Sequence, residues 1–190
     1  MTAPLRQVSM AVAVAAVMIV ACVACGRSDA GIPRRLAYPR PVLLDTAMRS
    51  VAGLPVHFEV NAAATDTCPQ SDWLDVVYST YGTTLHVTFS RTDAAHIAEV
   101  KSNRMERMML NNGDLPAHNT EWRNAAGWDV LVAVTLGSST PVQFFATDDS
   151  AMVVSGAAFF GKATPIDSVK PYVDAVRDDI VRSMNVLSWN

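Results

Sequence analysis

The residues most able to bind a metal are four histidines, and they are far apart in the sequence: His57, His86, His96 and His118. Zinc and related metals need several nitrogen or sulfur ligands at one point, which proteins often supply from pairs only a few residues apart. No two of these histidines stand that close, and no HExxH or CxxC pattern is present. We therefore expect no metal site. The lack of a glycine-rich phosphate loop also leads us to expect no cofactor.

Acid, base or nucleophilic chemistry could come from the serines of LGSS and VSGAAFFG or from the carboxylate pair Asp148 and Asp149. Neither serine segment has the Gly-x-Ser-x-Gly pattern that places a reactive serine on a strained turn, so we expect no catalytic residue. The two aspartates lie in a polar cluster, residues 147–150, between two apolar runs. Such side chains bond neighbouring backbone groups, so turn formation is one explanation of the pair. Contact with a partner protein is the other, and the sequence leaves both open.

The three cysteines bear on export rather than on catalysis. A positively charged start and a run of small apolar residues, 8–21, precede Cys22 and Cys25, as in the signal peptides of lipoproteins. We predict a signal peptide at residues 1–24 and lipidation of Cys25, because a polar Gly-Arg-Ser-Asp segment follows that cysteine. Cys22 is the alternative, in which case Cys25 could form a disulfide with Cys68. An uncleaved membrane anchor also stays open, although it needs about 18 apolar residues.

Charge is distributed unevenly beyond the signal peptide. Residues 27–49 hold five arginines and two aspartates, a net charge of +3, whereas residues 50–190 hold nine Lys/Arg and sixteen Asp/Glu, a net charge of −7. We predict a Pro/Arg-rich tether at residues 25–49 and a single domain at residues 50–190. A basic tether suits an anionic membrane surface, although a solvated linker would have the same composition. The acidic domain argues against nucleic-acid binding.

Apolar runs and alternating patterns predict antiparallel strands. The clearest is a hairpin at residues 141–162, whose second half is almost entirely apolar and therefore suits a central strand. A second hairpin, at residues 73–91, turns around Gly82. Further strands are expected at residues 54–61, 121–124 and 128–136, and loops at residues 61–72 and 114–120.

A first helix is predicted to begin at Thr92 or Asp93 and to end near Asn111, before Gly113. Its buried stripe is expected to contain Ala94, Ile97, the stem of Lys101, Met105, Met108, Met109 and Leu110. The four tryptophans are also expected in the core, which is the usual place for large aromatic side chains, although an exposed contact among them stays open. They are Trp73, Trp122, Trp128 and Trp189.

The last helix is predicted to begin with Asp167 as its N-cap and to carry Pro171 in its first turn. Its apolar stripe contains Val169, Tyr172, Val173, Val176, Ile180, Met184 and Leu187. The charged residues between these positions, Asp179 among them, are expected to face water, with Asp178 pairing with Arg182 one turn later. Together with the strands, these helices predict an α+β fold: an antiparallel sheet of six or seven strands packed by two main helices.

Several segments resemble one family. The strings VQFFATDD, SGAAFFG and DSVKPYVDAVRDDIVRSMNVLSW are similar to the C-terminal half of the gliding-motility lipoprotein family GldD of the Bacteroidota. PRRLAYPRP resembles its segment after the lipidated cysteine, and the Leu-His strand of the second hairpin also matches. Ser79 departs from the pattern, because the family usually has a proline there. The element order also resembles the PsbP-like fold, a likeness that implies no chemistry.

The resemblance implies a lipoprotein of the cell envelope, held in the bilayer by a palmitoylated N-terminal cysteine and facing the periplasm. It also implies a non-enzymatic component or accessory of the gliding-motility and type IX secretion machinery, which acts by contact with other envelope proteins. The alternative is a periplasmic small-molecule carrier or hydrolase that uses a cleft between the sheet and the helices. The absence of a paired nucleophile and base favours the first function.

Overall fold

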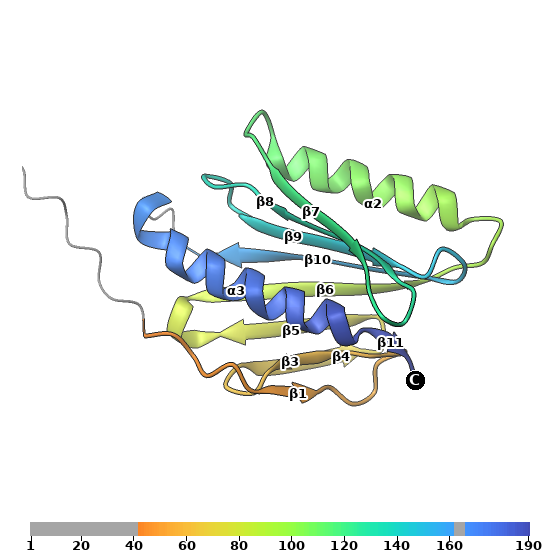
Figure 1. The fold of residues 1–190 in the computed structure, drawn as a ribbon, viewed down its shortest axis with the longest axis horizontal. Coiled ribbons are helices and arrows are strands. Elements are labelled where there is room, and N and C mark those ends of the chain that lie inside the picture. The colour runs from red at the N-terminus through yellow and green to blue at the C-terminus, as the bar shows by residue number, and fades with distance from the viewer. Residues whose placement is uncertain (1–41, 162–165) are drawn as a thin grey trace, which may run out of the picture. The chain divides into compact units, whose positions relative to one another are not determined.

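The predicted central hairpin lies in the middle of the main sheet (Figure 1). The structure, a computed structural model, describes residues 42–161 and 166–190. Within it, strands β9 (Val142–Thr147) and β10 (Met152–Phe160) pair antiparallel. All six residues of β9 are buried, as expected of a strand covered on both faces. The hairpin prediction is therefore confirmed.

The hairpin belongs to a seven-stranded antiparallel sheet with the order β4-β5-β6-β10-β9-β8-β7. From one edge β4, β5 and β6 run inward; the chain then crosses to the opposite edge, and β7, β8, β9 and β10 run back to meet β6. The bounds of the five other strands are Thr65–Gln70 for β4, Trp73–Tyr78 for β5, Thr83–Arg91 for β6, His118–Arg123 for β7 and Asp129–Val134 for β8. Strands β5 and β6 form the second predicted hairpin.

Residues 54–61 form two short strands outside the large sheet. Strand β2 (Val56–His57) pairs with β11 (Ser188–Trp189), and β3 (Glu59–Asn61) pairs with β1 (Met48–Ser50). The predicted alternation is present, because every second residue is buried: Val56, Phe58 and Val60. The pairing of β2 with β11 places residues 56–57 beside the last residues of the chain.

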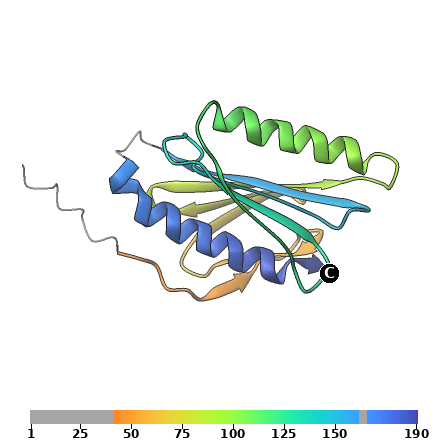
Figure 2. The same ribbon diagram turned by 45° about the horizontal axis from the view of Figure 1, so that its top comes forward.

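Two helices cover opposite faces of the large sheet (Figures 1 and 2). Helix α2 (Ile97–Asn112) lies over β9 and β10, and α3 (Ile166–Val186) lies over β8 and β9 and also contacts β3. The two faces separate within β9, where Phe144 belongs to the core beneath α3 and its neighbour Phe145 to the core beneath α2. The α+β prediction of one antiparallel sheet and two main helices is confirmed.

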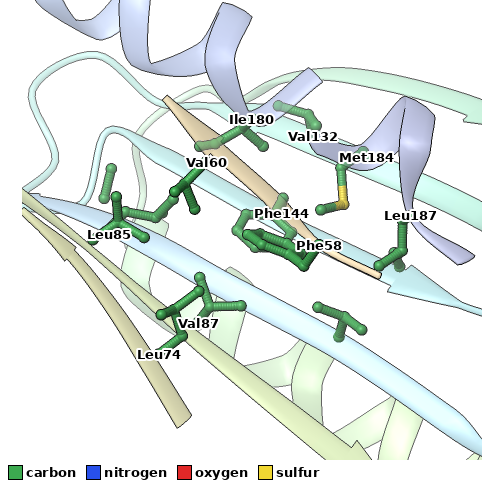
Figure 3. Close-up of a cluster of buried hydrophobic side chains, with 14 of the residues drawn as sticks. Phe58, Val60, Leu74, Leu85, Val87, Val132, Phe144, Ile180, Met184 and Leu187 are labelled. Carbon is green, nitrogen blue, oxygen red and sulfur yellow. The ribbon is translucent and has the colours of Figure 1, made fainter. Parts of the chain in front are cut away.

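The larger core lies between α3, β3 and the sheet (Figure 3). Ile180 and Met184 of α3 meet Phe144 of β9 and Phe58, which follows β2. Each of these side chains is at most 1% exposed. Full burial of side chains of this size stabilises the fold by about 1.5 to 3 kcal/mol each. The core beneath α2 is smaller and consists of Ile97, Met108, Leu131, Ala133, Phe145 and Val153.

Both loop predictions were partly wrong, at the two edges of the sheet. Strand β4 occupies half of residues 61–72, and β7 begins at His118, within residues 114–120. Edge strands need not show a clean alternation, because only part of their surface is buried. β7 is exposed along nearly its whole length, and β4 has a register shift between Thr67 and Gln70.

Helix α2 begins at Ile97, later than predicted, and ends at Gly113 as expected. The carboxylate of Asp93 instead organises the preceding turn, since it accepts hydrogen bonds from the N–H groups of Ala95 and His96. The predicted buried stripe was only partly right. Ile97 and Met108 are buried, whereas three other members of the stripe are exposed: Met105, Met109 and Leu110.

Helix α3 begins at Ile166, so Asp167 lies inside the helix and is not its N-cap. Pro171 is the sixth helical residue and therefore lies beyond the first turn. Asp179 was expected to face water but is only 3% exposed. The predicted pair between Asp178 and Arg182 is also wrong, because Arg182 pairs with Asp179 and Asp178 with Arg177.

Candidate functional site

The Asp148 turn, residues 148–151, joins β9 to β10 at one end of the sheet. Asp148 Oδ1 accepts hydrogen bonds from the backbone N–H groups of Ser150, Ala151 and Met152 at 2.9 to 3.1 Å, and its Oδ2 accepts one from the Ser150 hydroxyl at 2.7 Å. Burial opposes the charged form of Asp148, but these donors outweigh burial and lower its pKa to about 2. Asp148 is therefore the residue that holds the turn in shape.

Asp149 projects outward from the same turn. Its φ of +58° lies in the left-handed region, which aspartate tolerates better than most residues. The side chain is 56% exposed and forms an ion pair of 2.6 Å with Lys101 of α2. Only the hydrophobic stem of Lys101 was expected to contribute, as part of the buried stripe. In the structure its ammonium group also connects α2 to the Asp148 turn.

Trp189 lies beside the Asp148 turn, although it was expected in the core. Its indole N–H donates to Asp148 Oδ2 at 3.2 Å, and its ring packs against Trp128 with the centroids 5.9 Å apart. Trp128 is buried, whereas Trp189 is 43% exposed. The core prediction was wrong for Trp73 as well, which is 45% exposed at the start of β5. The turn therefore carries an exposed aromatic ring next to an exposed carboxylate.

An open hollow of about 230 Å³ lies next to the turn, between α2 and β7, β8 and β9. Its floor is apolar and includes Leu131 and Phe145, while Lys101, Glu121 and Asp129 stand around it. Asp129 also forms an ion pair with Arg123. Pockets that enclose a drug-sized ligand usually measure about 300 to 1,000 Å³. The hollow is therefore better suited to a side chain than to a whole small molecule.

Comparison with known proteins assigns the chain to a family. The family model described as gliding motility lipoprotein GldD matches residues 28–189. The chain belongs to the GldD family. No curated protein matches it. The GldD match includes the Asp148 turn and both helices, so the resemblance seen in the sequence is confirmed over nearly the whole domain.

The GldD domain contains a buried polar cluster around Asp179, beneath α3. Asn61 of β3 donates to the Asp179 carboxylate at 3.2 Å, and Arg182 donates to it from the next turn of the helix. The hydroxyl of Tyr78 is a third donor to this carboxylate. Asn61 also donates to the backbone oxygen of Asp45 at 2.7 Å. The cluster therefore joins α3, the large sheet and the first described residues of the chain.

Burial and hydrogen bonding have opposite effects on the pKa of Asp179 in this cluster. Burial raises the pKa of Asp179, and the hydrogen bonds from Arg182, Asn61 and Tyr78 only partly offset that rise. Burial also raises the pKa of Tyr78, and the neighbouring Asp179 carboxylate adds to the rise, so Tyr78 stays a protonated donor. One feature of the sequence indicated that Asp179 could be buried: it lies on the same helical face as Val176 and Ser183.

The four histidines do not come together. His86 Nδ1 forms a hydrogen bond with the Asp75 carboxylate at 2.6 Å, His96 pairs with Asp93 and His57 with Glu59. In the part of the chain that the structure describes, no three His, Cys, Asp or Glu side chains are placed to hold a metal ion. No serine hydroxyl bonds to the ring of His86 among the described contacts.

Cys22 and Cys25 lie outside the described residues, as does the tether up to residue 41. The GldD match begins at residue 28 and so does not choose between the two cysteines. Cys68 lies in β4, partly buried against the larger core. Among the described helices, none is both long and apolar enough to cross a membrane.

Proposed function

We propose that this chain is a non-enzymatic component of the gliding-motility and type IX secretion machinery that acts by contact with other envelope proteins. The match to the GldD lipoprotein family over residues 28–189 carries this proposal. Lipidation of Cys25, with Cys22 as the alternative, would hold the chain in the bilayer with its domain facing the periplasm.

The proposed contact surface is the Asp148 turn together with Trp189. Asp149 offers an exposed carboxylate and Trp189 an exposed indole face, and tryptophan is one of the residues most enriched at the energetic centres of protein interfaces. Asp148 positions both side chains, because its carboxylate fixes the turn and accepts a hydrogen bond from the Trp189 indole N–H. The adjacent hollow could receive one side chain of the partner.

The alternative function, a carrier or hydrolase, has less support. The hollow beside α2 is open and small, and the bond of His86 to Asp75 is not extended to a serine nucleophile among the described contacts. Acyl transfer of the serine type needs nucleophile, base and orienting acid in one line of hydrogen bonds. No described constellation therefore favours this second function.

The test is complementation of a deletion strain of the source organism. Loss of the chain should abolish secretion of type IX cargo or surface movement, and the wild-type chain should restore it. Asp149→Asn and Trp189→Ala should reach the membrane in normal amounts and fail to restore either activity. Asp178→Asn is the matched control, because Asp178 is also an exposed carboxylate in an ion pair, at 52% exposure compared with 56% for Asp149.

Two results would contradict the proposal in different ways. A deletion strain that secretes and moves normally would exclude a role in the machinery. A deletion phenotype that Asp149→Asn and Trp189→Ala both restore fully would retain the role but exclude the Asp148 turn as its contact surface. Immunoblots of membrane fractions must accompany both variants, since Trp189 also packs against buried Trp128.

A further inference from the structure

Exposed apolar side chains lie at the end of the domain opposite the Asp148 turn, some on or near the end of α2 and others in the first described residues. We name this group the apolar rim: Val42, Leu43, Met109, Leu110, Leu115 and Phe159. Leu110 and Val42 are 72% and 73% exposed, which is unusual for large apolar side chains. Several apolar side chains exposed at one end of a domain can mark a protein or membrane contact.

Backbone contacts place the end of α2 at this end of the sheet. The Ser138 hydroxyl donates to the backbone oxygen of Asn111 at 3.1 Å, which fixes the last turn of α2 over the loop between β8 and β9. The backbone N–H of Phe160 donates to the backbone oxygen of Ser139, in the same loop, at 3.5 Å. Leu110 and Met109 therefore lie beside the end of β10, where Phe159 is also exposed.

The first described residues lie at the same end. The N–H of Gly161 donates to the oxygen of Gly82 at 3.3 Å, and the hydroxyl of Tyr81 accepts the N–H of Leu44 at 2.8 Å. Figure 1 shows the last turn of α2 and the first coloured residues at the left end of the sheet, away from the Asp148 turn. The chain that leads to Cys22 and Cys25 therefore leaves the domain from the apolar rim.

We propose that the apolar rim rests on the surface of the lipid bilayer. This inference depends on the proposed lipid anchor, because the anchor joins the domain at the rim. At about 3.3 to 3.6 Å per extended residue, the segment between Cys25 and Val42 cannot carry the domain more than about 60 Å from the bilayer, and less if it is not extended. The rim is thus the part of the domain whose distance from the membrane is most restricted.

Charge supports a lipid surface as the occupant. Residues 27–49, which include Val42 and Leu43 of the rim, have a net charge of +3, whereas residues 50–190 as a whole have −7. The acidic remainder of the domain would be repelled by anionic lipid.

The experiment uses the full chain, expressed with its signal peptide and reconstituted in vesicles of phosphatidylethanolamine and phosphatidylglycerol, with or without brominated acyl chains. Bromine quenches tryptophan at the bilayer, so a tryptophan introduced by Leu110→Trp should lose fluorescence in the brominated vesicles. Val186→Trp is the matched control. Val186 is also an exposed aliphatic residue near a helix end, 39% exposed, but it lies next to β11 and the Asp148 turn.

Flotation of the vesicles tests the lipid anchor independently of the rim. A chain that floats, with Leu110→Trp quenched and Val186→Trp no more quenched than the unsubstituted protein, supports the proposal. A chain that floats with both substituted tryptophans quenched equally, or neither quenched, contradicts the bilayer-facing rim and leaves the anchor intact. A chain that fails to float contradicts both. Far-UV circular dichroism of each variant checks that the fold is unchanged.

Discussion

Asp148, Asp149 and Asp179 carry the same carboxylate in three different surroundings. Asp148 receives three backbone N–H donors and is held in its charged form. Asp149 is exposed and has one cation as a partner. Asp179 is buried, and its charge is tolerated because three side chains donate to it. The three residues therefore differ in what their loss would do: Asp148 and Asp179 affect stability, and Asp149 affects contacts.

Asp148→Ala should lower the free energy of unfolding by about 1 to 2 kcal/mol near neutral pH, because three N–H groups lose their acceptor. The pKa of Asp148 is lowered in the folded state, so its contribution is present above the ordinary value of 3.8 and is lost as pH falls through about 2. The difference from wild type should therefore shrink between those two values in urea denaturation. Asp149→Asn, which removes no backbone acceptor, should stay within about 0.5 kcal/mol of wild type.

Arg182→Met should destabilise the domain by about 3 kcal/mol, because it removes the cation that faces buried Asp179. Burial raises the pKa of Asp179, and without Arg182 it should rise further. A raised folded pKa means that stability is lost as pH increases, so the deficit should be larger near neutral pH than near the ordinary value of 3.8. Arg177→Met, which removes an exposed pair, should cost at most about 1 kcal/mol. Equal costs for the two variants in urea denaturation would contradict the role of Arg182.

Local patterns predicted Asp148 well and Asp179 badly. The turn cluster at residues 147–150 depends on neighbours in sequence, so side-chain chemistry alone could locate it. The partners of Asp179 include Asn61 and Tyr78, which are brought to α3 only by the folded sheet. A charged residue between apolar helical positions is normally solvated, and nothing local indicates that a distant amide and a distant hydroxyl will join Arg182 around it.

At the scale of the elements, the central strands fit together through one small residue. A Cβ added to Gly156 of β10 would lie 2.4 Å from the ring of Phe144 in β9 and 2.6 Å from the backbone oxygen of His86 in β6. Atoms this close must move apart, and the backbone oxygen belongs to a paired strand that cannot shift freely. Gly156 thus leaves room for the ring of Phe144 to pack against β10.

Gly156→Ala should therefore lower the free energy of unfolding by about 1 to 3 kcal/mol. Ala157→Ser adds one atom to the next residue, which points to the opposite face and is only half-buried, and should change stability by no more than about 0.5 kcal/mol. Thermal unfolding followed by circular dichroism compares the two. If both variants melt with the wild type, the space around Gly156 is larger than the contacts imply.

Elements in the middle of the sheet were predicted more reliably than those at its edges. The hairpin of β9 and β10 is continuous in apolar residues because it is covered on both faces. β4 was missed and β7 was predicted too short, at residues 121–124, because each has only one neighbouring strand and much polar surface. The exposed residues of α2 were placed in the core for a related reason: helical spacing identifies an apolar stripe, but not whether a protein core or a membrane covers it.

At the scale of the whole molecule, the proposed attachment to the membrane depends on one cysteine. Cys25→Ser should abolish incorporation of labelled palmitate and formation of the mature chain, while Cys22→Ser should leave both unchanged. Gel electrophoresis of labelled cells measures both effects. Loss of labelling in Cys22→Ser alone would reverse the assignment, and a disulfide between Cys25 and Cys68 should then be sought by non-reducing electrophoresis.

The pairing of β2 with β11 joins Val56 to Trp189, and Asn61 reaches Asp179 across most of the domain sequence. Strands this far apart along the chain cannot pair until the later one has been made. During synthesis the domain therefore stays open while its last helix and strand are still being added. The proposed export would benefit from this delay, because a chain that folds late can still pass unfolded through a narrow translocation channel and fold on the far side.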